Sequence, residues 1–443
     1  MENFEKREFI ASHKKEIEPL LDDGEKILFD NNNESDVNTL LEKYETKLFY
    51  YETQEISSGA KNVLFSVNDT GAYGIVEPLI RSLKQDANCS GIGVLASGPA
   101  RKSIETQFHG ELEEVLNKKD KLLVDILEFS QSKQIDVVVG TVSVLNGPEG
   151  VVLYGGKKNL GAKKIFLIAD GWGTLGSQFS SGNQSTLDDI DAILCADEFA
   201  SKIFQRQLPE VPKELFEITG SPMLDSLQVE NPEIFTRQAR EKLSLNEDTI
   251  AVLYIGDVSA DYEQEKYDSM VNEKTFTQTF NGFIKLAEIN QDKQYALMFR
   301  PHPRDPNKEA LLKEVDAMKF PKNMRVILAG REILSMQEAR YAADAVLSII
   351  STENFFASRM GRQTVFLGYR NGNLGGKALD QVFGQDLLGE LLSTDSKMSV
   401  ASSGDELAEI LKNCRRAPQE VADFPKEYRS KGSIENIKKR ILI

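Results

Sequence analysis

Three residue types are scarce in this chain: its 443 residues include three histidines, three cysteines and one tryptophan. Cys89, Cys195 and Cys414 lie far apart in the sequence and lack the short spacings of a zinc site or a redox motif. We therefore expect reduced, buried thiols and a cytoplasmic protein. The sequence also lacks a nucleophile elbow, a pair of carboxylates at catalytic spacing and a cluster of metal ligands. Hydrolase and metalloenzyme interpretations have no support, so we expect neither a metal site nor a resident cofactor.

Long hydrophobic runs are absent as well. No stretch of about 18 apolar residues occurs, so the sequence predicts no membrane-spanning helix. The first residues, Met1 to Glu8, are acidic and carry no apolar core, so we do not expect a signal peptide. With 40% hydrophobic and 28% charged residues, the composition is typical of an ordinary soluble globular protein.

Acidic residues outnumber basic residues, and the two kinds are unevenly distributed along the chain. The formal net charge of −16 argues against a general nucleic-acid-binding protein. Residues 1–60 hold fifteen acidic side chains against seven basic ones, whereas residues 415–443 hold eight basic against four acidic. The basic end is compatible with peripheral contact at an anionic membrane, and a solvated helix face is the alternative. Both interpretations stay open, as does a homodimer.

The length and the pattern of apolar runs predict two α/β domains. A chain of 443 residues is too long for one hydrophobic core. Residues 1–60 show helical spacing of apolar residues and predict a helical N-terminal extension. From residue 61 onward, short β-branched runs alternate with helical patterns, which is typical of doubly wound sheets. We expect one Rossmann-like domain at 61–228, a second at 233–402, and helices at 403–443 that pack back toward the first domain.

Eleven apolar runs are the expected strands. In the first domain they are Val63–Val67, Ile92–Ala96, Ile135–Val139, Lys164–Ala169, Ile190–Cys195 and Phe216–Gly220. In the second domain they are Thr249–Ile255, Tyr295–Phe299, Met324–Leu328, Ala345–Ile350 and Thr364–Leu367. A cleft between the two domains is the default ligand site.

The strand that starts at Tyr295 runs into Arg300-Pro-His-Pro303. The two prolines restrict their neighbours, so Arg300 and His302 are expected to be extended. A stiff loop at the carboxyl end of a buried strand presents these two side chains at the edge where α/β proteins bind ligands. The alternative is a solvated strand-to-helix loop with an incidental histidine.

Residues 171–176 match G-x-G-x-x-G, but the sequence after the third glycine is a poor helix former, so we do not predict a dinucleotide site. The same loop follows a strand and carries Asp170. A general base at this edge is therefore best assigned to Asp170, with Asp69, Glu77 and His109 as the other candidates. A solvated loop carboxylate is the alternative for Asp170.

Hydroxyl side chains surround the next predicted strand-to-helix turn. Ser348 ends the strand, and Ser351 and Thr352 open the helix. A helix N-terminus carries unsatisfied N–H groups and a partial positive charge, so it suits a pyrophosphate. Arg300 and His302 can add charge-assisted hydrogen bonds to the same phosphates. The alternative, compatible with the first, is that Ser351 caps its helix.

Three segments resemble the GT-B superfamily of nucleotide-sugar glycosyltransferases and the related UDP-N-acetylglucosamine 2-epimerases. Residues Ile190–Phe199, leading to Thr219-Gly-Ser-Pro-Met-Leu-Asp225, are similar to the end of the first domain with its TGxPxxD turn. Arg300-Pro-His-Pro303 resembles the R-x-H-P element of glycerophosphotransferases and related polymerases that use CDP- or CMP-activated donors. Residues Ala343–Phe366 resemble the donor-site strand, loop and helix.

The chain also departs from these families. Phe355 and Phe356 stand where many members carry an acidic residue that grips a ribose, and Glu353 is the nearby candidate replacement. Residues Ile255–Val258 lack the histidine that the epimerases carry after the first strand of their second domain, which lowers the epimerase interpretation. Gln363 replaces the usual proline.

The resemblance implies a GT-B fold in which 61–228 is the acceptor domain and 233–402 the nucleotide-donor domain. The implied activity is that of a metal-independent glycosyltransferase, or a glycerophosphotransferase-like enzyme, in cell-surface polysaccharide synthesis. Its donor would be a UDP-sugar or a CDP-linked compound, and its acceptor a glycan or a lipid-linked molecule. The alternatives are a UDP-N-acetylglucosamine 2-epimerase-like enzyme and a non-catalytic sugar-nucleotide-binding or assembly subunit.

The resemblance and the residue arguments together define the expected site. The expected catalytic residues are Asp170 and His302. The expected substrate-binding residues lie at glycine turns and strand ends: Gly71, Gly220, Arg300, Ser348, Ser351, Thr352 and Glu353.

Overall fold

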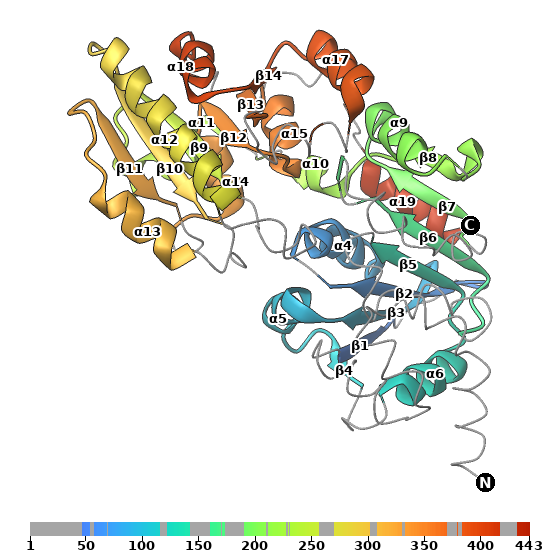
Figure 1. Ribbon diagram of the computed structural model, residues 1–443. Coiled ribbons are helices and arrows are strands. Elements are labelled where there is room, and N and C mark those ends of the chain that lie inside the picture. The colour runs from blue at the N-terminus through green and yellow to red at the C-terminus, as the bar shows by residue number, and fades with distance from the viewer. Residues whose placement is uncertain are drawn as a thin grey trace, which may run out of the picture. The chain divides into compact units, whose positions relative to one another are not determined.

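Two compact α/β units make up the protein. The computed structural model describes residues 47–53, 57–68, 70–115, 122–141, 160–169, 171–172, 190–209, 211–226, 229, 231–256, 270–301, 308–329, 333–369, 379, 383–416 and 432–443. The first unit comprises Met1–Ser226 with Ser430–Ile443, and the second comprises Leu227–Arg429 (Figure 1). Among the described residues, no helix combines the length and the apolar character needed to cross a membrane.

The first unit is built on an eight-stranded sheet in the order β4-β1-β3-β2-β5-β6-β7-β8. Its strands are β1 (Lys47–Glu52), β2 (Lys61–Val67), β3 (Cys89–Ala96), β4 (Glu113–Glu114), β5 (Val137–Thr141), β6 (Lys164–Ile168), β7 (Ala192–Cys195) and β8 (Phe216–Ile218). The pairs from β3 to β8 are parallel, whereas β1 runs antiparallel to both β3 and β4. The parallel part, β3-β2-β5-β6-β7-β8, follows the flavodoxin-like 2-1-3-4-5 order with β8 added as a sixth strand.

Helices cover this sheet because its central strands, β2, β3, β5, β6 and β7, are buried along most of their length. They are α4 (Thr70–Leu83), α5 (Gly98–Gln107), α6 (Leu122–Lys133), α9 (Glu198–Gln207), the 3₁₀ turn η4 (Lys213–Leu215), α10 (Pro222–Ser226) and α19 (Ser433–Leu442). The red α19 lies beside α4 and α10 although it comes from the far end of the chain (Figure 1). Its Ile437 and Ile441 are fully buried in the core that β2, β3 and α4 form. The last helix therefore completes the core of the first unit.

The charged side chains of α19 are paired within the same unit. Arg440 holds both carboxylate oxygens of Glu217, at 2.7 and 2.8 Å. Lys438 pairs with Asp86 at 2.9 Å. These contacts occupy two cations of the basic C-terminal segment, and membrane contact by that segment stays a prediction.

The expected helical extension over residues 1–60 is wrong for Lys47–Glu52, which forms β1 in the first sheet. Leu48, Phe49 and Tyr50 are buried, and aromatic residues of this kind favour a pleated, half-buried surface. Residues 1–46 lie outside the described part of the chain. The six strands expected in 61–228 are confirmed as β2, β3, β5, β6, β7 and β8.

The second unit contains a six-stranded, wholly parallel sheet in the order β11-β10-β9-β12-β13-β14. Its strands are β9 (Thr249–Ile255), β10 (Gln294–Arg300), β11 (Met324–Leu328), β12 (Ala345–Ser348), β13 (Gln363–Leu367) and β14 (Met398–Ala401). The five strands expected in this domain are confirmed, and β14 was not predicted. The order is the Rossmann 3-2-1-4-5-6 arrangement, which reverses between β9 and β12.

Helices lie on both faces of this sheet, as the doubly wound prediction requires. They are α11 (Pro232–Lys242), α12 (Met270–Ile289), α13 (Lys308–Ala317), α14 (Met336–Ala342), α15 (Thr352–Arg359), α17 (Gly384–Thr394) and α18 (Gly404–Lys412). One core includes residues of α12, α13 and α18, and a second includes residues of α11, α14 and α15. In Figure 1 the yellow α12 lies across the strands of its unit.

The helices after residue 403 divide between the two units. α18 packs against α12 of the second unit, so it does not return to the first, whereas α19 belongs to the first unit. The contact of α12 with α18 depends on two glycines. A Cβ atom on Gly282 would lie 2.4 Å from the carbonyl oxygen of Gly404, so the two backbones approach too closely for any side chain.

Candidate functional site

The reversal of strand order in the second sheet places the carboxyl end of β9 beside that of β12. In open α/β sheets, ligands bind in the crevice that such a reversal creates. β9 ends at Ile255 and is followed by Gly256, whose N–H donates to the carbonyl oxygen of Arg300 at 2.9 Å. β12 ends at Ser348, and α15 begins at Thr352. The N-terminus of α15 therefore opens at the reversal point.

Ser351 caps α15 through its side chain and its backbone. Its φ of −143° and ψ of 144° are extended, and its hydroxyl accepts the N–H of Glu353 at 3.2 Å. Its carbonyl oxygen accepts the N–H of Asn354 at 3.0 Å. The capping role expected from the sequence is confirmed. Thr352 is half-buried in the first turn, and the donor-binding roles of Ser351 and Thr352 stay predictions.

Ser348 lies fully inside the unit and donates its hydroxyl hydrogen bond to Oδ1 of Asn354. Asn354 is also fully buried, and its backbone carbonyl accepts from the hydroxyl of Thr364 at 3.3 Å. Ser348 thus ties the end of β12 to the first turn of α15. Its predicted contact with a ligand stays a prediction.

Arg300 ends β10 with only 7% of its surface exposed. Its Nη1 donates to the carbonyl oxygens of Ala329, at 3.2 Å, and Leu334, at 2.9 Å. Arg300 therefore holds the segment that leads into α14, a contact that the sequence argument missed. Its predicted role as a phosphate ligand stays a prediction, and His302 and Asp170 lie outside the described residues.

Glu353, in the first turn of α15, forms a two-bond ion pair with Arg340 of α14. Nη2 of Arg340 donates to Oε1 of Glu353 at 2.6 Å, and Nε donates to Oε2. The two side chains are 6% and 13% exposed, respectively. The guanidinium of Arg340 also lies over the ring of Phe356, 5.1 Å from its centroid. Arg340 was not predicted, because nothing local marks its pairing with a residue on another helix.

Phe355 occupies the expected place of an acidic ribose contact and belongs to the core. Its ring packs against those of Phe366, at 6.0 Å between centroids, and Phe383, at 6.2 Å. Phe355 and Phe356 are each 1% exposed. Phe355 therefore contributes to core packing against β13, at the position where an acidic residue was expected. The carboxylate in the first turn of α15 is that of Glu353.

Solved structures are similar to this chain in fold. A UDP-GlcNAc 2-epimerase from Neisseria meningitidis bound to UDP-GlcNAc is 12% identical, with 86% of this chain and 99% of that chain covered and a TM-score of 0.55. MnaA from S. aureus, in a structure with UDP, is 14% identical, with 86% and 96% covered and a TM-score of 0.57. A variant of the wall teichoic acid polymerase TagF is 13% identical, with 92% and 93% covered and a TM-score of 0.52.

The protein has the GT-B fold. The resemblance that the three sequence segments suggested is thereby confirmed at the level of the fold. No protein-family model matches the chain, and the comparison with curated proteins found no match.

In the first unit of this GT-B protein, the two predicted glycines lie in different settings. Gly71 is exposed in the first turn of α4. Gly220 is buried with a φ of +89°, and its N–H donates to the carbonyl oxygen of Cys195 at 3.3 Å. Because L side chains rarely adopt this φ, a glycine is required at the turn after β8. Substrate contact by either glycine stays a prediction.

The alternatives to Asp170 are placed as follows. Glu77 pairs with Arg81 within α4, and His109 is exposed beyond the end of α5. Near Asp170, the indole N–H of Trp172 donates to Oδ2 of Asp197 at 2.9 Å, and Asp197 caps α9. The chain just after Asp170 is thus anchored to a helix N-terminus, while Asp170 and Asp69 lie outside the described residues.

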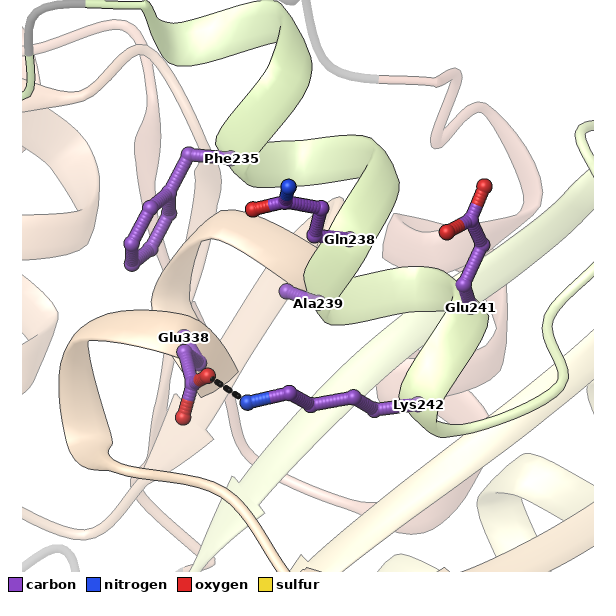
Figure 2. Close-up of a pocket in the computed structure, with 6 residues that line it drawn as sticks. All are labelled: Phe235, Gln238, Ala239, Glu241, Lys242 and Glu338. Atoms are coloured by element: carbon purple, nitrogen blue, oxygen red, sulfur yellow. Dashed lines mark hydrogen bonds and ion pairs between the residues drawn. The ribbon is translucent and has the colours of Figure 1, made fainter.

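A cavity of about 260 Å³ lies between α11 and α14 of the second unit (Figure 2). Its lining residues are Phe235, Gln238, Ala239, Glu241, Lys242 and Glu338. Figure 2 shows the ion pair of Lys242 with Glu338 at one side of the cavity. The hydrogen bond from Lys242 lowers the pKa of the Glu338 carboxyl. Because no predicted site residue lines this cavity, we assign the candidate donor site to the sheet edge instead.

The described residues offer no group of three His, Cys, Asp or Glu side chains that could hold a metal ion. All three cysteines are free and buried, as expected. Burial raises the pKa of the Cys89 and Cys414 thiols to about 12, and it also raises the pKa of Cys195. These thiols are therefore protonated at neutral pH and do not act as nucleophiles.

Proposed function

We propose that the protein transfers a group from a nucleotide-activated donor to an acceptor in the synthesis of a cell-surface glycan. The observation that carries this proposal is the Rossmann order of the second sheet, with α15 opening where that order reverses. The similarity in fold to a protein bound to UDP-GlcNAc and to a wall teichoic acid polymerase supports the same class of substrate.

In the proposed site, the donor's phosphates lie at the N-terminus of α15. Backbone N–H groups and the helix dipole there favour negative charge. His302, which follows β10 in the sequence, is the proposed hydrogen-bond donor to the phosphates. Asp170, which follows β6 in the sequence, is the proposed base that takes the proton of the acceptor hydroxyl.

The transfer would proceed by attack of the acceptor oxygen on the donor. The new bond forms as the bond between the transferred group and the nucleotide's phosphate oxygen breaks, and the electron pair leaves on the nucleotide. In this proposal, the N-terminus of α15 and His302 stabilise the negative charge that develops on the leaving phosphate, so the reaction needs no metal ion. This account of the bond formed, the bond broken and the leaving nucleotide is the same for a glycosyl donor and for a CDP-linked donor.

A panel of nucleotides tests this proposal. UDP, CDP, CMP, GDP and ADP are added separately to the full chain, and the melting temperature is measured. A ligand at a hundred times its dissociation constant stabilises the folded state by about 2.7 kcal/mol. Stabilisation by one or two of them supports the proposal, whereas no shift with any of them overturns it.

A sugar-nucleotide 2-epimerase is the second candidate, because two of the similar structures carry UDP or UDP-GlcNAc. Incubation with donor alone separates the two activities, since an epimerase changes or releases product without an acceptor. Retained nucleotide binding without turnover, even with acceptor, would favour a non-catalytic binding subunit.

A further inference from the structure

We infer that Arg340 is a positioning residue of the donor site, which neutralises Glu353 so that the N-terminus of α15 can receive an anionic donor. This inference rests on the proposed function. It assigns a role in nucleotide affinity to a residue on α14, a helix outside the strand-to-helix turn itself.

The first step is the location of Glu353. It lies in the first turn of α15, where the helix dipole stabilises negative charge. The phosphates of a donor use the same positive helix end. An unpaired carboxylate at this place would therefore compete with the donor for the helix end and repel it.

The second step is the pair itself. Arg340 contacts both carboxylate oxygens of Glu353, and the two side chains are 6% and 13% exposed. A buried two-bond pair is stronger and more directional than a solvated one, because water screens it little. The pair has no net charge, and it holds the carboxylate toward α14.

The third step is the support of Arg340. Ser335 and Glu338 form a reciprocal capping box at the start of α14, which fixes the helix that carries Arg340. Arg300 donates to the carbonyl oxygen of Leu334, the residue before Ser335. The ring of Phe356 lies under the guanidinium of Arg340. The contacts thus run from the end of β10 through α14 to the first turn of α15.

The test measures binding of UDP and CDP by calorimetry to four forms of the full chain: the parent, Arg340→Met, Glu353→Gln and the double variant. Arg340→Met should weaken binding about tenfold, since an unpaired charge at a partly buried helix end has an effect of this size. Glu353→Gln should bind as tightly as the parent or tighter, whereas the direct ribose contact that the sequence predicts for Glu353 would require a loss of affinity. The double variant should return to within about threefold of the parent, because both charges are gone.

Two further measurements separate charge from structure. The deficit of Arg340→Met should shrink as salt rises from about 0.05 to 0.5 M, since salt screens repulsion but does not repair packing. Arg340→Lys keeps the positive charge but cannot hold both oxygens, so its affinity should fall between those of the parent and Arg340→Met. Circular dichroism and melting temperature confirm that each variant is folded.

Each other outcome has a defined meaning. A double variant as weak as Arg340→Met overturns the inference and makes Arg340 a direct ligand or a purely structural residue. Loss of affinity in Glu353→Gln alone overturns it in favour of a direct Glu353 contact. Equal affinities in all four forms overturn the inference and leave the proposed function standing. A parent that binds neither nucleotide, here and in the wider panel, overturns the proposed function and the inference with it.

Discussion

The carboxylate of Asp225 supplies the N-terminal cap of α19. Its Oδ2 accepts the hydroxyl of Ser433 at 2.5 Å, and the two residues are 208 positions apart. The N–H of Ile434 donates to the same oxygen at 3.4 Å. Gly432, the preceding residue, has a φ of +102° and offers no side-chain cap. This contact joins the two segments of the first unit, which precede and follow the second unit in the sequence.

Asp225→Ala should therefore loosen α19 and expose the apolar face that carries Ile437 and Ile441. Loss of a helix cap costs about 0.5–2 kcal/mol. The free energy of unfolding in urea measures the loss. Glu435→Ala, on the exposed side of α19, is the matched control and should change stability by no more than about 0.5 kcal/mol. Equal effects of the two variants would contradict the capping role.

The stability contribution of Asp225 should depend on pH. Burial raises the pKa of its carboxyl in the folded state. A raised folded pKa means that the folded state binds the proton more tightly than the unfolded state. The stability from this ionisation is therefore fully present below the unfolded pKa and is lost as pH rises through the folded pKa. Relative to the parent, Asp225→Asn should gain stability as pH rises above about 4, the unfolded pKa of an aspartate, measured by urea unfolding. A constant difference would contradict this.

Arg300→Ala and His302→Ala should fail in different ways. Arg300→Ala leaves the carbonyl oxygens of Ala329 and Leu334 without their bonds to Nη1, which costs about 1–3 kcal/mol for each buried group. His302→Ala should instead weaken nucleotide binding about 10- to 150-fold with a melting temperature near that of the parent. Affinity and melting temperature are measured on both variants. Normal stability with lost affinity in Arg300→Ala would make Arg300 a phosphate ligand.

The contact of α12 with α18 should not tolerate a methyl group. Gly282→Ala places a Cβ atom 2.4 Å from the backbone oxygen of Gly404, so the helices must separate at a cost of about 1–3 kcal/mol or more. Gly389→Ala in α17 is the control, because its Cβ atom meets nothing within 4 Å. That variant should be stabilised by up to about 1 kcal/mol. Thermal unfolding of both variants decides the matter.

Turnover should survive excess EDTA. In the proposed site, the N-terminus of α15 and His302 hold the phosphates, so chelation should leave the rate within about twofold of the untreated protein. The check is a donor–acceptor assay with and without EDTA. Loss of turnover that magnesium or manganese restores would contradict the metal-independent proposal.

Much of the fold could be predicted from the sequence, because the signals are local. The β-branched run Thr249–Ile255 forms β9, and the serine cap at Ser351 begins α15. Such preferences depend on neighbours within a few residues. β1 was missed because its short aromatic run follows a segment with helical spacing, and its antiparallel partner β3 lies far along the chain.

The sequence by itself determined the alternation of strands and helices, and hence two doubly wound sheets, because periodicity and capping act over short distances. Only the tertiary structure decided what the charged residues contact. Arg340 meets Glu353, Arg300 meets two backbone carbonyls, and Asp225 meets Ser433. These partners lie on different elements, so strand order and helix packing bring them together, and no local pattern in the chain encodes that proximity.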